Sequence, residues 1–186
     1  MSSYEHRRAA AAGARRASSL VMKTLILVRH AKSSWKDRGL PDRLRPLNKR
    51  GRRDAPVMGT RLAERGVDVE LIVSSPAERA IDTAEAMAEE LEYPWDEIVT
   101  DERLYGADAE EILTVIEDQD DEIDTLIVVG HNPGLLVLVN GLWAADLDNL
   151  PTGGVVELVY DIARWDEVEP TKPLQVRYDY PKRDRR

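Results

Sequence analysis

The stretch that decides the fold is a short apolar run with a basic pair at its end, Thr24-Leu25-Ile26-Leu27-Val28-Arg29-His30. An unbroken run of β-branched and apolar residues is typical of a strand that is buried on both faces. Such strands belong to parallel sheets that helices cover on both sides. The run therefore predicts a central strand whose carboxyl end presents Arg29 and His30.

Further along the chain, short apolar runs alternate with segments of helical periodicity. The expected strands cover residues 24–28, 69–74, 97–100, 125–130 and 155–160. The expected helices carry the apolar faces Ala55-Met58-Leu62 and Ala80-Ala84-Met87-Leu91, and two more cover 109–117 and 134–143. Val176, Tyr178 and Tyr180 alternate like an edge strand whose length nearby prolines limit. The alternation predicts an α/β fold, a three-layer sandwich with a mainly parallel central sheet and helices on both faces.

The length and composition suit one soluble globular domain. The chain has 186 residues, of which 42% are hydrophobic and 33% are charged, and we expect a single domain over residues 23–186. Residues 1–22 are rich in Ala, Arg and Ser and show no amphipathic period, so we expect a disordered N-terminal extension there. No apolar run is long enough to span a bilayer, and we expect a cytoplasmic protein without a membrane partner.

The cysteine count and the net charge exclude several classes of function. The chain contains no cysteine, which excludes disulfides, thiolate metal sites and a cysteine nucleophile. The net charge of -9 argues against nucleic acid as a partner, because non-specific binding needs clustered cations that neutralise phosphates. Any anion site in this chain is therefore expected to be local.

Two of the expected helices begin just after expected strands. Ser75-Pro76-Ala77-Glu78 has the capping-box pattern with proline at the first helical position, and Asn132-Pro133 repeats the arrangement of cap and proline. Ligands collect at the carboxyl ends of parallel strands, where free amides and helix dipoles favour anions. The pattern therefore predicts an anion-binding crevice at this edge of the sheet.

Four basic side chains fall on the predicted edge. Arg29 and His30 end the first expected strand. Arg79 lies in the first turn of the second helix, and His131 follows the fourth strand. Guanidinium groups form bidentate contacts to phosphoryl oxygens, and an imidazole can act as nucleophile or proton carrier near neutral pH. One such residue alone is more often structural or solvated, as we expect for His6, but four together favour a phosphoryl site.

These residues belong to four segments that resemble a known family. Residues 27–35 read LVRHAKSSW. The other segments are Arg45-Pro46-Leu47 with Gly51, Ser74-Ser75-Pro76 with Arg79 and Thr83, and Gly130-His131-Asn132-Pro133. In order and approximate spacing they resemble the motifs of the histidine phosphatase superfamily, specifically its small branch of SixA-like phosphohistidine phosphatases. The resemblance spans about residues 24–160 and implies a phosphoglycerate-mutase-like fold.

The resemblance implies catalysis through a phosphorylated enzyme. His30 is then the catalytic nucleophile that attacks phosphorus, and water cleaves the resulting phosphohistidine. Arg29, Arg79 and His131 are implied as catalytic residues that bind the phosphoryl oxygens and stabilise their charge. Arg45 is expected as a further phosphate-binding residue. We expect neither a cofactor nor a metal.

Two charged stretches allow a less specific interpretation. Between residues 37 and 53 lies a cationic cluster in an otherwise acidic chain, Arg43, Arg45, Lys49, Arg50, Arg52 and Arg53. It forms either a positive rim of the site or a solvated loop and helix start, because charge runs usually face water. The acidic segment Glu117–Asp124 contains no base, and we expect a solvated loop rather than a metal site.

Many members of the superfamily use a carboxylic acid to protonate an alcohol leaving group. The stretch Asp101 to Ala107 resembles that segment poorly, and Glu102 is the possible acid in it. Asp108 is better explained as the cap of the third helix, with Glu111 closing a capping box. A missing acid matters less for phosphohistidine, because imidazole leaves more readily than an alkoxide. The leading hypothesis is therefore hydrolysis of the P–N bond of phosphohistidine in a phosphoprotein.

Two alternatives stay open, and they differ in the partner that they need. The same nucleophile would serve a phosphomonoesterase that acts on a small phosphorylated substrate, and a non-catalytic phosphate-binding module would use the cationic residues alone. The intact His30 argues against the module, because a binder needs no nucleophile. A mutase is disfavoured because the short chain offers little enclosure for a phosphorylated product.

Overall fold

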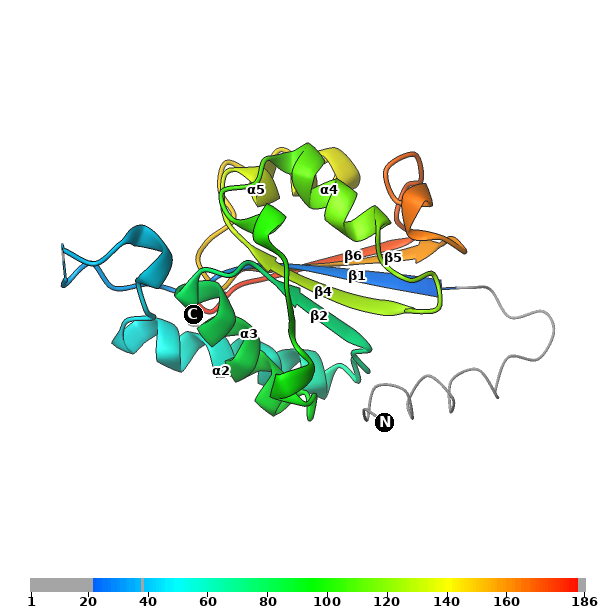
Figure 1. Ribbon diagram of the computed structural model, residues 1–186. Coiled ribbons are helices and arrows are strands. Elements are labelled where there is room, and N and C mark those ends of the chain that lie inside the picture. The colour runs from blue at the N-terminus through cyan, green and yellow to red at the C-terminus, as the bar shows by residue number, and fades with distance from the viewer. Residues whose placement is uncertain (1–21, 38, 184–186) are drawn as a thin grey trace.

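The computed structural model describes residues 22–37 and 39–183, and Figure 1 shows a central sheet between helices. The strands are β1 (Met22–Arg29), β2 (Leu71–Ser74), β3 (Val99–Thr100), β4 (Thr125–Gly130), β5 (Val155–Asp161) and β6 (Gln175–Asp179). The α-helices are α2 (Lys49–Glu64), α3 (Glu78–Glu90), α4 (Ala109–Glu117) and α5 (Gly134–Trp143). Short 3₁₀ helices are η1 (Asp42–Leu44), η2 (Trp95–Glu97), η3 (Glu102–Leu104) and η4 (Trp165–Glu167).

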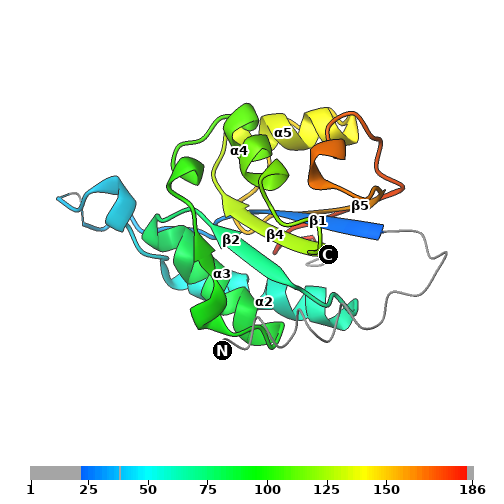
Figure 2. The ribbon, with the colours of Figure 1, turned by 45° about the vertical axis from the view of Figure 1, so that its right-hand side comes forward.

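The sheet has six strands in the order β3-β2-β4-β1-β5-β6. β1 pairs with β4, and β2 pairs with β4 and β3, all in parallel. β5 runs antiparallel to both of its neighbours, β1 and β6. In Figures 1 and 2, α2 and α3 lie on one side of the sheet and α4 and α5 on the other. The predicted three-layer α/β fold with a mainly parallel sheet is confirmed.

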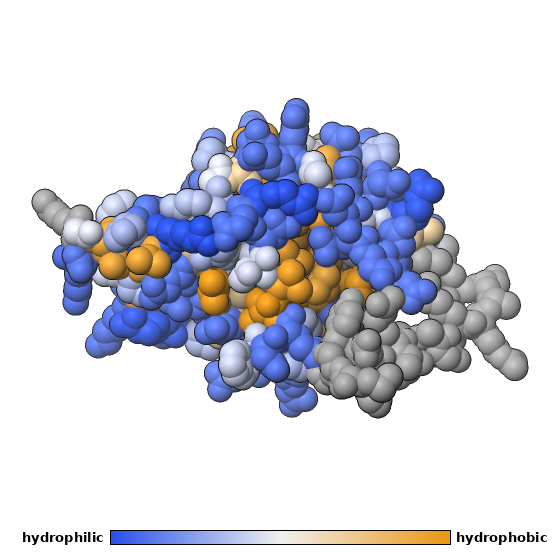
Figure 3. All heavy atoms as spheres, in the orientation of Figure 1, coloured by the Kyte–Doolittle hydropathy of each residue, from blue (hydrophilic) through white to orange (hydrophobic). Residues whose placement is uncertain are grey.

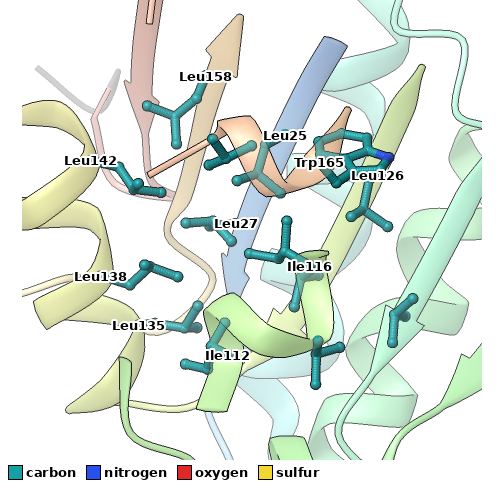
Figure 4. Packing of buried hydrophobic residues seen from close by; sticks show 14 of the residues in the cluster. Leu25, Leu27, Ile112, Ile116, Leu126, Leu135, Leu138, Leu142, Leu158 and Trp165 are labelled. Carbon is teal, nitrogen blue, oxygen red and sulfur yellow. The ribbon is translucent and has the colours of Figure 1, made fainter. Parts of the chain in front are cut away.

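The alternation of side chains along β1 explains the two layers of the core. Leu25 and Leu27 pack on one face of the sheet in a cluster with residues of α4 and α5, and Figure 4 shows these contacts. Ile26 and Val28 point to the opposite face, where they pack with residues of α2 and α3. All four side chains are fully buried, and each such burial stabilises the fold by roughly 1.5–3 kcal/mol.

Several element boundaries differ from the prediction. β1 already begins at Met22, so only residues 1–21 of the predicted extension lie outside the described residues. β3 is reduced to Val99–Thr100, because residues 95–97 form the 3₁₀ helix η2. The predicted edge strand near the C-terminus is confirmed as β6, which ends before Pro181.

The acidic segment 117–124, which contains no base of its own, is contacted by a lysine from β1. Lys23 of β1 is fully buried, and its Nζ atom donates to the carbonyl oxygens of Asp121 and Ile123, each at 2.8 Å. The ammonium group also lies 5.0 Å from the ring centroid of Trp165. The base was missed because it comes from a strand about a hundred residues earlier in the chain.

The surface in Figure 3 is mainly hydrophilic, with a hydrophobic area in the middle of the face shown and a smaller one toward its left-hand end. None of the helices in the described part of the chain is both long and apolar enough to cross a membrane.

The segment between β1 and α2 extends away from the body of the molecule in Figures 1 and 2. Its two ends are held together, since the Asn48 amide donates to the Lys32 carbonyl at 2.9 Å and the Ser34 amide donates to the Pro46 carbonyl at 2.8 Å. Gly51, in the first turn of α2, lies so close that a Cβ atom there would be 2.2 Å from the Lys32 oxygen. The glycine therefore allows the helix to pack against the segment that follows His30.

We predict that Gly51→Ala destabilises the protein by about 1–3 kcal/mol, because the added methyl group forces a rigid backbone contact apart. Urea unfolding of both proteins measures the difference. Gly141→Ala is a matched control: Gly141 lies in α5, and a Cβ atom there meets nothing within 4 Å. Replacing this helical glycine by alanine is expected to stabilise the helix by up to about 1 kcal/mol. Equal effects of the two substitutions on the free energy of unfolding would contradict the packing argument.

Candidate active site

Three neighbouring parallel strands deliver the candidate residues to one edge of the sheet. β2, β4 and β1 are adjacent, and their carboxyl ends are followed directly by Ser75, His131 and His30. The ring centroids of His30 and His131 are 5.1 Å apart. The predicted meeting of the two histidines at the carboxyl edge of the sheet is therefore found in the structure.

His30 is held by its backbone and has a defined tautomer. Its amide donates to the Gly130 carbonyl at 3.1 Å, and its carbonyl accepts from the Gly153 amide at 3.1 Å. The ring atom Nδ1 lies 2.8 Å from the Ala31 carbonyl oxygen. A carbonyl oxygen can only accept, so Nδ1 carries the proton. The Nε2 atom is left with a lone pair, as a nucleophile requires.

His131 lies between a serine and an arginine. Its Nε2 atom is 2.7 Å from the Ser75 hydroxyl, and its Nδ1 atom is 3.5 Å from an Arg79 guanidinium nitrogen. Because a guanidinium can only donate, Nδ1 turns its lone pair toward Arg79 and Nε2 donates to Ser75. A hydroxyl can also donate, so rotation of the Ser75 proton would allow the opposite tautomer, with an Nδ1 proton available to an anion.

One turn of α3 links Arg79 to the segment that follows β1. Thr83 is four residues beyond Arg79 on the same face of the helix, and its hydroxyl donates to the Arg79 carbonyl at 2.6 Å. The same hydroxyl accepts from the Ala31 amide at 2.9 Å. Thr83 thus fixes the distance between the helix that carries Arg79 and the residue next to His30.

Arg29 lies at the end of β1, where the connection between α5 and β5 passes. One of its terminal nitrogens donates to the Leu150 carbonyl at 2.6 Å and to the Asn149 side chain at 3.3 Å. Its Nε atom is buried and has no hydrogen-bond partner among the described residues. An unsatisfied buried donor is costly, and an anion bound at this edge would satisfy it.

Burial and positive neighbours keep both imidazoles neutral. Burial is the main cause that lowers the pKa of His30 to about 3; the charges of Arg79 and Arg29 act in the same direction, and the Ala31 contact opposes them. Burial and Arg79 lower the pKa of His131 to about 4. At neutral pH the two rings are therefore uncharged, and the positive charge of the site comes from guanidinium groups.

The structure does not present Arg45 as an open phosphate ligand. Its side chain is buried, and its three nitrogens donate to the Ser34 carbonyl at 3.1 Å, to Asp42 at 2.5 Å and to the Ser33 hydroxyl at 2.6 Å. The guanidinium also stacks 3.3 Å from the ring centroid of Trp35. Arg45 reaches the other site residues through Asp42, which also contacts Arg79.

Glu102 lies in an exposed ion pair rather than in a setting that favours an acid. Both of its carboxylate oxygens accept from Arg43, at 2.5 and 2.8 Å. The Arg43 guanidinium holds the pKa of Glu102 below its usual range. A general acid needs a pKa that is raised toward neutrality, so the environment of Glu102 disfavours that role.

The two predicted caps next to the site are wrong in detail. The N-cap of α3 is Ala77 and that of α5 is Pro133, and neither side chain caps its helix. The Ser75 hydroxyl contacts His131 at 2.7 Å and accepts from the Ala77 amide at 3.4 Å, and the side-chain amide of Asn132 donates to the Leu150 carbonyl at 3.2 Å. The site thus uses both side chains that local pattern assigns to capping. The predicted capping box of Asp108 with Glu111 is confirmed.

Only some residues of the cationic cluster 43–53 are available to form a positive rim of the site. Arg50 and Arg53 both pair with the buried carboxylate of Asp54, and Arg43 pairs with Glu102. Lys49, Arg50 and Arg52, together with Lys36, line a recess beside the segment that follows His30. In the described part of the chain, no group of three or more histidine, aspartate or glutamate side chains is arranged to hold a metal ion.

The sequence did not predict that three further residues contact the site. Asp42 contacts Arg79, Arg45 and the Tyr105 hydroxyl. The Tyr105 ring stands edge-on to His131 with centroids 6.0 Å apart. Asn149 accepts from Arg29. The position of Asp42, three residues before Arg45, was the only sequence signal for any of these contacts.

The depressed pKa values of the two imidazoles predict a loss of stability in acid. In the unfolded chain both protonate near the ordinary value of 6.5, but in the folded protein only near 3 and 4. The unfolded state binds more protons in this window, so the free energy of unfolding falls as the pH drops below about 6.5, by at most about 1.4 kcal/mol per pH unit for each imidazole. Urea unfolding between pH 7 and pH 5 measures the slope.

His30→Gln and His131→Gln each remove one of these groups, and each variant is expected to show a shallower loss of stability with falling pH than the unchanged protein. An identical slope in all three proteins would show that the imidazoles are not buried as neutral groups.

Comparisons with known proteins agree with this geometry. The profile of the histidine phosphatase superfamily (branch 1) matches residues 25–112. An uncharacterized protein of Mycobacterium tuberculosis is 32% identical over 165 residues, which cover 83% of this chain and 100% of that protein. The match to the family profile therefore extends over the segments that carry Arg29, His30 and Arg79.

Solved structures show the same fold. A protein named phosphohistidine phosphatase SixA from Agrobacterium tumefaciens is 27% identical, with a TM-score of 0.70 over 83% of this chain and 97% of that chain. A structure named phosphohistidine phosphatase SixA from Nakamurella multipartitia is 24% identical, with a TM-score of 0.75 over 86% of this chain and 96% of that chain. From its motifs, its site geometry and these matches, the chain belongs to the histidine phosphatase superfamily.

Proposed function

We propose that this protein is a phosphatase that hydrolyses phosphohistidine in a phosphoprotein, with His30 as the nucleophile. The observation that carries the proposal is the contact of a neutral His30 imidazole with His131, at 5.1 Å between ring centroids, beside the guanidiniums of Arg79 and Arg29. A nucleophile that is neutral and surrounded by cations attracts a phosphoryl anion and still keeps its lone pair.

The reaction proceeds in two displacements at phosphorus. The Nε2 lone pair of His30 forms the bond to phosphorus while the bond to the substrate imidazole breaks and its electron pair leaves with that ring. A water molecule then attacks the phosphohistidine, the bond to Nε2 breaks, and inorganic phosphate is released. Arg29 and Arg79 stabilise the charge on the phosphoryl oxygens in both steps, and His131 donates from Nδ1 once its tautomer has changed.

The environment of the site supports a substrate whose leaving group needs little help from an acid. Arg43 lowers the pKa of Glu102, and burial with Asp42 raises the pKa of the Tyr105 hydroxyl. Neither group is therefore tuned to release a proton at neutral pH. Imidazole and aryl leaving groups depart more readily than the alkoxide of a sugar phosphate, which favours phosphoramidates and activated esters.

A protein substrate and independence from metal are parts of the same proposal. The guanidiniums of Arg29 and Arg79 supply the positive charge that phosphoryl transfer needs, a role that metal ions play in other phosphatases. Asp42, which contacts Arg79 at the site, is exposed, and an exposed position of this kind beside the site suits a phosphorylated side chain on a protein surface. The two similar structures carry the name phosphohistidine phosphatase SixA, and this name supports the choice of substrate.

We predict that the purified protein hydrolyses an aryl phosphate without added metal and that His30→Ala abolishes turnover while circular dichroism and the unfolding midpoint stay close to those of the unchanged protein. In the unchanged protein, rapid quenching with labelled substrate is expected to trap a phosphoenzyme that is stable in alkali and labile in acid, as phosphohistidine is.

His6→Ala is the matched control, since it removes the third histidine of the chain at a position outside the described residues. Full activity is expected for that variant. Undiminished turnover or an undiminished phosphoenzyme in His30→Ala would overturn the assignment of the nucleophile.

Substrate class is tested by comparing kcat/KM for a phosphohistidine-containing protein with kcat/KM for sugar phosphates. We predict a preference for the phosphoprotein, because neither Glu102 nor Tyr105 is tuned to protonate an alkoxide. A preference for the sugar phosphates would reject the proposed substrate and favour the small-molecule phosphomonoesterase with the same nucleophile.

A further inference from the structure

A single carboxylate joins three side chains at the outer wall of the site. Asp42, the first residue of η1, accepts from Arg45 at 2.5 Å through Oδ1 and from Arg79 at 3.0 Å through Oδ2. The Tyr105 hydroxyl donates to the same Oδ2 atom at 3.0 Å. The Asp42 side chain remains 49% exposed, whereas those of the two arginines are 8% exposed.

Asp42 accepts hydrogen bonds from Arg79 through two separate atoms. The backbone carbonyl of Asp42 accepts from one terminal nitrogen of Arg79 at 2.7 Å, and the carboxylate accepts from the other. The second nitrogen also faces Nδ1 of His131 at 3.5 Å. Asp42 therefore fixes the plane of the guanidinium, so that its remaining donors point toward His131 and the place of the phosphoryl group.

Arg45 is connected to this arrangement through Asp42. Its other two donors are fixed by Ser33 and Ser34, which follow His30 along the chain. The chain of contacts runs from the segment after His30 through Arg45 and Asp42 to Arg79. It ties the strand that carries the nucleophile to the helix that carries the phosphate-binding arginine.

The carboxylate also sets the charge of the site. Burial raises the pKa of Asp42, but the hydrogen bonds from Arg45 and Tyr105 and the charge of Arg79 outweigh burial and hold it below its usual range. With both imidazoles neutral, the three guanidiniums and this one carboxylate leave a formal charge of +2. That charge balances a phosphoryl dianion, so the placement of Arg79, rather than additional attraction, is what Asp42 contributes.

We propose that Asp42 is a positioning residue that holds Arg79 in the geometry of the transition state, and that Arg45 acts on the reaction through Asp42 instead of binding phosphate itself. The proposal rests on the proposed function, because it takes His30 as the nucleophile and Arg79 as the ligand of the phosphoryl oxygens. It assigns Asp42 no contact with the reacting atoms.

The test is a double-mutant cycle of Asp42→Ala, Arg45→Ala and the double variant, with an aryl phosphate as substrate. Misplacing one oriented group costs up to about a hundredfold in rate, and we expect each single variant to lose kcat by about ten- to a hundredfold. KM and inhibition by inorganic phosphate are expected to change by less than about threefold, because ground-state binding does not need the oriented geometry. The double variant is expected to be no worse than the poorer single variant.

A readout without turnover separates this proposal from the proposed function. Orthovanadate can adopt the five-coordinate geometry of the transition state, and its affinity, measured by calorimetry, is expected to fall in the same three variants in parallel with kcat. If the unchanged protein shows no turnover, the proposed function fails, while the vanadate cycle still tests the coupling between Asp42 and Arg45.

Asp37→Ala is the matched control, because Asp37 is a carboxylate of the same extended segment and accepts from the Gly39 amide at 2.9 Å. It is expected to leave kcat unchanged. Asp42→Asn, which keeps the size of the side chain but loses its charge, serves if Asp42→Ala unfolds. Additive losses from the Asp42 and Arg45 substitutions, weaker phosphate binding as the main effect, or a gain of activity without the carboxylate would each overturn the proposal.

Discussion

An uncharged imidazole surrounded by guanidinium groups is the constraint on which the site depends. Like charges repel, so a protonated His30 beside Arg29 and Arg79 would be unstable in a buried setting, and burial with these neighbours keeps its pKa near 3. The same physics leaves the Nε2 lone pair available, while the Ala31 carbonyl holds the proton on Nδ1. Burial beside guanidinium groups therefore accounts for both the neutrality of His30 and the attraction of the site for an anion, while the Ala31 carbonyl sets the tautomer.

The fold meets this constraint by bringing distant segments to one edge. Because β2, β4 and β1 are parallel neighbours, their carboxyl ends lie side by side, and each is followed by a residue of the site. Helix α3 adds a guanidinium group and a hydroxyl group to the residues that follow the strands. α3 supplies Arg79 at its start, and Thr83 binds that helix to the residue after His30. A buried sheet thus converts three sequence positions far apart into one compact arrangement.

Asp42 shows how an acidic residue can serve a cationic site. A carboxylate beside Arg79 reduces the positive charge that attracts phosphate, which is a cost for binding, but it removes the rotational freedom of a long side chain. Catalysis depends more on the placement of charge than on its amount. The contacts to Arg45 and Tyr105 spread this restraint over three segments of the chain.

The sequence by itself determined the α/β class, the places of β1, β4, α4 and α5, and the meeting of His30 and His131 at one edge of the sheet, because each of these follows from a local pattern or from a motif in order. The tertiary structure alone decided that Ser75 serves His131 rather than a helix cap, that Glu102 is neutralised by Arg43, and that Asp42 orients Arg79. The physical reason is distance along the chain: these contacts join residues 56, 59 and 37 positions apart, and no periodicity or local propensity carries information over such a separation.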